Sequence, residues 1–257
     1  KHGHISGFVF APTLAEAYTF AHECDPEADF GGTAVFNREV DAETAKLVGK
    51  NSDVVDSSVY TEIVIAPGYS PDALNILKAK QKRKMRIIYG KGRSDYPYDI
   101  KMHEGLLLVQ ETPHELKRLD TNSLTYPTKT KVDDETLAKL LAAWNIVRKV
   151  RSNGIVIGDG KISGGTLNYF WTLGVASFRK RNGATKISLE NAGERARGAV
   201  AASDGFFPFR DSVDLLGKAG VQAIIQPGGS ISDAAVVKAA DDYGVAMVFT
   251  HTRTFKH

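Results

Sequence analysis

The chain has 257 residues, of which 42% are hydrophobic and 25% charged, and its formal net charge is +3. This composition is that of a globular protein and excludes a mainly disordered, collagen-like or low-complexity chain. The charge is too small to indicate a nucleic-acid partner, and no apolar run approaches the roughly 18 residues of a membrane span. The single cysteine, Cys24, excludes an internal disulfide and a multi-cysteine metal site, and it fits a reducing, cytoplasmic location.

Strand and helix patterns alternate along the chain, which predicts an α/β fold of layered sheets and helices. In the first half, apolar or β-branched runs predict strands at residues 7–11, 33–37, 61–66, 85–89 and 105–110. Helices are predicted after Thr13, over residues 41–48, and from Ser70-Pro71, where serine caps the helix and proline occupies its first turn. Residues 91–103 are expected to form a loop.

The second half begins after a polar, irregular stretch at residues 111–132, which we expect to connect two subdomains at residues 1–110 and 133–257. The strongest helix begins at Asp133, with apolar residues at helical spacing. Beyond it, the pattern predicts strands at residues 154–158, 221–226 and 245–250, and helices at 166–180 and 233–243. We expect the N-terminal part of the first subdomain to lie upstream of Lys1.

The chain begins with a Lys-His pair, in which a permanent cation stands beside a base. A neighbouring ammonium favours the neutral, proton-accepting imidazole that general base catalysis needs, although an exposed pair without function fits as well. The turn DPEADFGG at residues 25–32 has two glycines that would let a ligand approach the backbone, or it is simply a tight turn.

Three later segments combine residue types suited to a nucleotide. SDGFFPFRD (203–211) mixes three Phe, Pro and Arg between two Asp, which fits a planar apolar ligand with polar edges. QPGGS (226–230) lies between a strand and a helix, where backbone amides can meet an anion, but it lacks the Walker lysine and the GxGxxG spacing. RTFKH (253–257) brings an arginine for phosphate and a phenylalanine for stacking, with a frayed basic tail as the alternative.

The basic run KAKQKRKMR (78–86) falls at the end of a predicted helix and lacks interleaved aromatic residues. A solvated helix C-terminus is therefore favoured over a nucleic-acid patch. The seven histidines form neither HExxH nor an HxE paired with PCxxC, so the sequence predicts no metal site.

These segments, in this order, resemble the AICAR transformylase part of the bifunctional purine-biosynthesis enzymes, which also carry an IMP cyclohydrolase domain. The matching segments are Lys1-His2, DPEADFGG, TEIVIAPG, LLLVQ, RSNGIV, SDGFFPFRD, QPGGS and the terminal RxFxH. The resemblance implies two subdomains similar to cytidine deaminase, with mixed sheets flanked by helices and without zinc. It also implies a homodimer with active sites between the subunits. The implied reaction transfers a formyl group from 10-formyltetrahydrofolate to the 5-amino group of AICAR.

The resemblance also implies roles for particular residues. His2 would help to remove a proton from the amine of AICAR, Lys1 would support charge on the formyl oxygen, and Asn153 would hold the reacting groups in position. The residues implied in substrate binding are Phe30, Gly31, Glu62, Phe206, Arg253 and Phe255. Those implied around the folate are Pro208, Asp211 and Ser230.

Two segments depart from the family. KHGHISG (1–7) replaces the usual KHxNPCG, and KISGGTLNYFWTL (161–173) stands where the family has a glycine-rich GxGxGQxSR segment. Because the arginine of that segment lies near the folate in the family, formyl phosphate or another formate-derived donor is an alternative. We expect Tyr169, Phe170 and Trp171 to narrow or fill the folate pocket. A non-catalytic nucleotide-binding homologue, acting as a structural or regulatory partner, is the alternative to an enzyme, but retention of Lys1 and His2 with Asn153 favours the enzyme.

Overall fold

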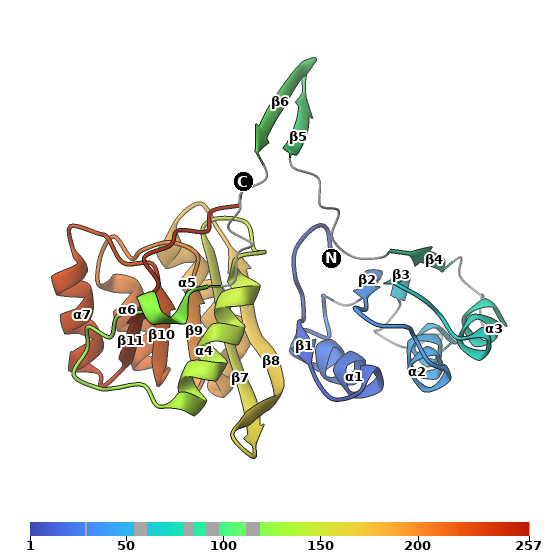
Figure 1. Ribbon diagram of the computed structural model, residues 1–257, viewed down its shortest axis with the longest axis horizontal. Helices are drawn as coiled ribbons and strands as arrows, with labels where there is room; N and C mark the ends of the chain where they lie inside the picture. Colours follow the sequence, from blue (N-terminus) through green and yellow to red (C-terminus); the bar gives the residue numbers. More distant parts are fainter. Residues whose placement is uncertain (29, 54–60, 80–84, 91–97, 112–118, 257) are drawn as a thin grey trace.

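A computed structural model describes residues 1–28, 30–53, 61–79, 85–90, 98–111 and 119–256 of the chain. It confirms an α/β structure in which sheets are flanked by helices (Figure 1). No helix in this described part of the chain is long and apolar enough to cross a membrane.

The larger sheet has six strands in the order β1-β8-β7-β9-β10-β11. Strands β9, β10 and β11 run parallel, whereas β7 is antiparallel to both of its neighbours, β8 and β9. The carboxyl ends of β8 to β11 and the amino end of β7 therefore lie along one edge of the sheet. The strands are β1 (Val9–Phe10), β7 (Gly154–Ser163), β8 (Thr166–Ser177), β9 (Val200–Ser203), β10 (Ala223–Gln226) and β11 (Ala246–Phe249).

Each face of the larger sheet has its own core, because side chains alternate between faces along a strand. In β7, Ile155 and Ile157 pack on one face with α5 (Arg181–Ala192), α6 (Asp211–Lys218) and α7 (Asp233–Asp242). Val156 packs on the other face against α4 (Asp134–Val147), whose Trp144 is fully buried. The larger sheet is thus covered by helices on both sides.

The smaller sheet consists of three parallel strands, β2 (Gly32–Val35), β3 (Thr61–Ala66) and β4 (Arg86–Tyr89). Its core includes residues of α2 (Ala42–Asp53) and α3 (Pro71–Ala79). Helix α1 (Leu14–Cys24) contributes the buried Tyr18 to this core and also contacts β8 of the larger sheet. This helix therefore connects the two sheets.

Strands β5 (Tyr98–His103) and β6 (Leu106–Glu111) form an antiparallel hairpin that stands away from both sheets (Figure 1). Its side chains include seven exposed large hydrophobic residues. These are Tyr98, Ile100, Met102, Leu106, Leu107, Leu108 and Val109.

Several predicted elements are corrected. The helix predicted at residues 166–180 is wrong, because these residues form strand β8, paired with β7 across a turn at Gly164 and Gly165. The run is rich in aromatic and β-branched residues, which favour a strand. The loop predicted at residues 91–103 is wrong for residues 98–103, which form β5. Sequence reasoning also missed β9, α5 and α6.

The connection predicted at residues 111–132 contains a short 3₁₀ helix, η2 (Thr121–Ser123), followed by Leu124, which is buried in the core beside α4. Thr125 then bridges to Phe249 of β11. The division into subdomains at residues 1–110 and 133–257 stays a prediction, and β1 of the first range pairs with β8 of the second. Residues 80–84 of the basic run, 91–97 of the loop, 112–118 of the connection, and positions 29 and 257 lie outside the described residues.

Candidate active site

One edge of the larger sheet gathers most of the segments that sequence analysis selects. Asn153 directly precedes β7, and the terminal RxFxH follows β11. The segments SDGFFPFRD and QPGGS each begin at the last residue of a strand, β9 and β10 respectively. Ligands of α/β sheets bind beyond the carboxyl ends of parallel strands, where loops converge. The topology therefore brings segments that are a hundred residues apart to one place.

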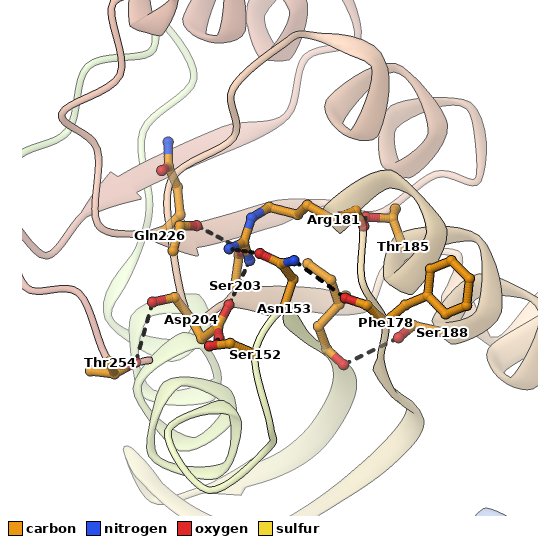
Figure 2. Close-up of polar contacts among 12 residues, drawn as sticks. Ser152, Asn153, Phe178, Arg181, Thr185, Ser188, Ser203, Asp204, Gln226 and Thr254 are labelled. Atoms are coloured by element: carbon orange, nitrogen blue, oxygen red, sulfur yellow. Dashed lines mark hydrogen bonds and ion pairs between the residues drawn. The ribbon is translucent and has the colours of Figure 1, made fainter. Parts of the chain in front are cut away.

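Asn153 is held at both ends of its side-chain amide (Figure 2). Its Oδ1 accepts a hydrogen bond of 2.8 Å from Nη2 of Arg181, and its Nδ2 donates to the backbone oxygens of Phe178 and Arg179, both at 3.3 Å. Its backbone also pairs with that of Phe178 in both directions, at 3.1 and 3.2 Å. The amide is therefore fixed in a single orientation.

Arg181 is in turn held by a buried carboxylate. Its Nη1 donates to Asp204 at 2.5 Å and to Oγ of Ser203 at 2.8 Å. The Asp204 side chain has no exposed surface and also accepts from Oγ of Ser152. Ion pairing and hydrogen bonding offset the cost of burying both charges.

Lys1 and His2 line a cavity of about 330 Å³ together with Arg151 and Ser177, whereas Asn153 is not among its lining residues. Arg151 precedes Asn153 by two positions, and Ser177 precedes its hydrogen-bond partner Phe178. Among the described lining residues, Lys1, Lys149 and Arg151 are cationic and Asp25 is the one acidic group. The excess of positive charge in the cavity lining suits an anionic ligand.

The predicted ligand loop at Phe30 and Gly31 contacts the first residue of the chain. The Nζ of Lys1 donates a hydrogen bond to the backbone oxygen of Phe30. A Cβ at Gly31, whose φ is +69°, would lie 3.0 Å from the same Nζ. The structure thus brings Lys1, Phe30 and Gly31 together, and Gly31 suits both the positive φ and the close approach of the ammonium.

The terminal segment folds onto SDGFFPFRD. The guanidinium of Arg253 lies 4.7 Å from the ring centre of Phe206, a cation–π contact. A Cβ at Gly205 would lie 2.5 Å from the Phe255 ring, so this ring packs directly on the Gly205 backbone. Phe206, Arg253 and Phe255 therefore form one cluster, whereas Phe207 is buried in the core.

The loop QPGGS uses its own side chains to satisfy its backbone amides. Gly228 N–H donates to the side chain of Gln226 at 2.9 Å. The N–H groups of Gly229 and Ser230 donate to the carboxylate of Asp233, at 2.7 and 3.1 Å. Each of these amides therefore has an internal acceptor in this structure, and binding of an external anion here stays a prediction that requires exchange of these partners.

The remaining predicted residues are placed as follows. Ser230 lies in this loop, where its Oγ accepts from Ser232 N–H, and Asp211 is the first residue of α6. Pro208 is half-buried just before α6. Glu62 lies on β3 of the smaller sheet, where its carboxylate pairs with Arg86 of the neighbouring strand β4.

The aromatic residues expected to narrow the folate pocket pack against other parts of the chain, and their place relative to that pocket stays a prediction. Phe170 is fully buried in the core beside α4. Tyr169 donates to Glu16 of α1 at 3.0 Å and packs edge-on against Phe20, and Trp171 pairs with Val9 of β1. None of the three lines the cavity of Lys1 and His2.

Sequence reasoning missed Arg181 and assigned no role of its own to Asp204, which lies in the selected segment SDGFFPFRD. Arg181 lies 28 residues beyond Asn153, because the long β7–β8 hairpin separates them. The SFRKR run after the hairpin was the available signal, since it restores basic residues to this edge.

Comparisons with known proteins agree with the resemblance. A family model described as "AICARFT/IMPCHase bienzyme" matches residues 1–168. The chain is 39% identical over its whole length to the bifunctional purine biosynthesis protein PurH of Shouchella clausii and to that of Anoxybacillus flavithermus, and 38% identical to that of Bacillus thuringiensis. It spans 47% of each of these relatives, about half their length.

A solved structure of RibD from Acinetobacter baumannii overlaps 46% of this chain and 35% of its own, with 17% identity and a TM-score of 0.29. This overlap is too low to carry an argument. The family model alone covers well over half of the chain. The chain belongs to the AICARFT/IMPCHase bienzyme family.

Proposed function

We propose that this chain is a formyltransferase that transfers a formyl group to the 5-amino group of AICAR, giving FAICAR. The observation that carries the proposal is the cavity lined by Lys1, His2, Arg151 and Ser177, since Arg151 is close in sequence to Asn153 and Ser177 adjoins its hydrogen-bond partner Phe178. A base, a cation and an oriented amide are the groups that acyl transfer to a weakly nucleophilic amine needs.

In this proposal the AICAR amino nitrogen forms a bond to the formyl carbon while the bond from that carbon to the donor breaks. His2 accepts the proton that the amino group loses, and the proton then passes to the departing donor atom. Lys1, which the loop at Phe30 holds in the cavity, stabilises negative charge that develops on the formyl oxygen. Asn153 positions the amine.

The nucleotide phosphate would bind at Arg253, whose guanidinium is held over Phe206. Phe255 would stack on the base, and Phe30 and Gly31 would contact it from the opposite loop. Glu62 lies on the smaller sheet and pairs with Arg86, so it would have to exchange that partner to reach the ribose.

For the formyl donor we propose 10-formyltetrahydrofolate, held by Pro208, Asp211 and Ser230. Supporting this, Phe209 between the first two is 66% exposed and Ile231 next to the third is fully exposed. An exposed apolar surface beside polar groups fits a planar ring with polar edges. Formyl phosphate or another formate-derived donor stays the alternative, because KISGGTLNYFWTL stands where the family has its glycine-rich segment.

We further propose a homodimer with active sites between subunits, two subdomains similar to cytidine deaminase without zinc, and a cytoplasmic location without nucleic-acid or membrane partners. The exposed hydrophobic side chains of the β5–β6 hairpin support a surface that a second copy covers. Light scattering on the purified protein tests the dimer, and a monomeric mass at micromolar concentration would contradict it.

The function is tested by assaying FAICAR formation with 10-formyltetrahydrofolate and, separately, with formate plus ATP. We expect turnover with the folate donor, and thermal stabilisation by AICAR and by a reduced folate added separately. Stabilisation by AICAR without turnover from any donor would instead support the non-catalytic nucleotide-binding homologue.

A further inference from the structure

Arg181 is a buried cation that the proposed chemistry does not itself use. It is the first residue of α5, and its side chain is 6% exposed. Taking a guanidinium out of water is costly, and the cost is offset only when its donors find well-placed acceptors. Three side chains provide them here: Asp204, Ser203 and Asn153.

The two terminal nitrogens of the guanidinium have different hydrogen-bond partners. Nη1 faces the acceptors at the end of β9, Asp204 and Ser203, which anchor it to the sheet. Nη2 faces Oδ1 of Asn153. The planar fork of arginine delivers both sets of hydrogen bonds from one rigid group, which the single ammonium of lysine cannot reproduce.

The contacts also determine the positions of the oxygen and the nitrogen in the side-chain amide of Asn153. A donor faces Oδ1, and two backbone oxygens face Nδ2. Rotating the amide by half a turn would place its N–H groups against the guanidinium and its oxygen against two carbonyls. Arg181 therefore selects one of the two amide orientations.

Both Nδ2 protons have backbone acceptors, whereas Oδ1 retains a second lone pair. Toward a substrate, Asn153 in this orientation offers a hydrogen-bond acceptor. The acceptor suits an N–H of an amine or carboxamide, and the charge of Arg181 polarises the amide that presents it.

We infer that Arg181, anchored by Asp204, is a positioning residue that acts through Asn153 and presents its oxygen to a substrate N–H. This inference rests on the proposed function and deepens it. The same Asp204 also accepts at its backbone oxygen from Thr254 N–H at 3.0 Å, between Arg253 and Phe255. One buried residue thereby ties the oriented amide to the proposed phosphate-binding segment.

The test compares Arg181→Lys with Arg195→Lys in the full chain. Arg195 is a matched control because it is exposed and, among the described residues, its guanidinium donates to the backbone oxygens of Asn191 and Ala192 alone. We expect Arg181→Lys to lower kcat for AICAR by about 10- to 100-fold, the cost of a misplaced reacting group, and Arg195→Lys to leave it unchanged.

A double-mutant cycle separates positioning from a purely structural effect. In an Asn153→Ala background, Arg181→Lys should change kcat by less than about twofold, because the residue through which it acts is gone. A loss of kcat of equal size in both backgrounds would overturn the inference, as would an Arg181→Lys enzyme with normal kcat.

A second measurement needs no activity. The side-chain amide resonances of Asn153 in an NMR spectrum, assigned by their loss in Asn153→Ala, should shift in Arg181→Lys and stay in place in Arg195→Lys. If the wild-type chain forms no FAICAR from any donor, the proposed function fails while this spectrum still decides the orientation. If Arg181→Lys does not fold, Ser203→Ala should move the same resonances by a smaller amount, and unmoved resonances would overturn the inference.

Discussion

Gly205 is the position at which one added methyl group most directly tests the anchored amide. A Cβ there would lie 2.5 Å from Nη2 of Arg181 and 2.5 Å from Cε1 of Phe255. Real Cβ atoms essentially never approach other atoms within 3.0 Å. In a Gly205→Ala variant, the guanidinium and the ring must therefore both move, each by about 1 Å, to restore ordinary contact.

The size of the effect follows from what Arg181 would lose. A displacement of about 1 Å takes its 2.8 Å bond to Asn153 beyond hydrogen-bonding range. Losing a hydrogen bond to a charged group costs about 1.5–3 kcal/mol, and overpacking a filled site costs about 1–3 kcal/mol. We therefore expect Gly205→Ala to lower the free energy of unfolding by about 2.5–6 kcal/mol, or Tm by roughly 5–24 °C.

The assay compares thermal melting and kcat of Gly205→Ala with those of Gly198→Ala. Gly198 has a φ of +77°, so alanine there is strained by about 1 kcal/mol, but a Cβ meets nothing within 4 Å. We expect both variants to be less stable and only Gly205→Ala to lose activity, by at least about tenfold. A Gly205→Ala protein with the Tm and kcat of the wild type would refute the reasoning.

Four further predictions follow from single residues. His2→Ala should lower kcat by roughly 10²–10⁴-fold with little change in AICAR affinity, measured by steady-state kinetics and calorimetry; a normal kcat would require another base. Phe170→Ala should cost about 3–5 kcal/mol in urea unfolding, since its ring is fully buried. The hydrogen bond from Arg210 holds the pKa of Asp214 below its usual value, so an Arg210→Gln variant should be less stable than wild type at neutral pH, and the difference should shrink as pH falls below about 4. Burial raises the pKa of the Cys24 thiol, so alkylation at pH 8 should be slow in the native protein and fast in urea; equal rates would contradict the burial.

The elements that sequence predicted well are those with local signals at their ends. Thr13 and Asp133 accept hydrogen bonds from the N–H groups of Glu16 and Thr136, as helix caps do. The run Thr61–Ala66 forms a strand with parallel neighbours on both sides, as its continuous apolar character predicts. In each case a few adjacent residues determine the outcome.

The helix predicted at residues 166–180 is wrong, because the residues before it have the turn chemistry of a β-hairpin. Two glycines at φ +59° and +73° join Ser163 to Thr166, which pair directly across the hairpin. A Gly-Gly step between two apolar runs is the signal of a two-residue hairpin loop. With that turn recognised, the aromatic run that follows is expected to alternate between sheet faces, as Phe170 and its half-buried neighbours do.

The candidate site likewise contains residues that local sequence identifies and residues that only the tertiary structure identifies. Motifs such as SDGFFPFRD and the Lys-His pair could be found from sequence, because unusual residue combinations stand next to each other in the chain. The contact of Arg181 with Asn153 could not, since it depends on β7 and β8 running antiparallel, which returns the chain to its starting edge after 28 residues. Once that topology is known, the first basic residues after the hairpin must lie beside the residue before it. Sequence therefore identified the groups proposed to carry the chemistry, whereas the residues that orient them emerged only from strand pairing.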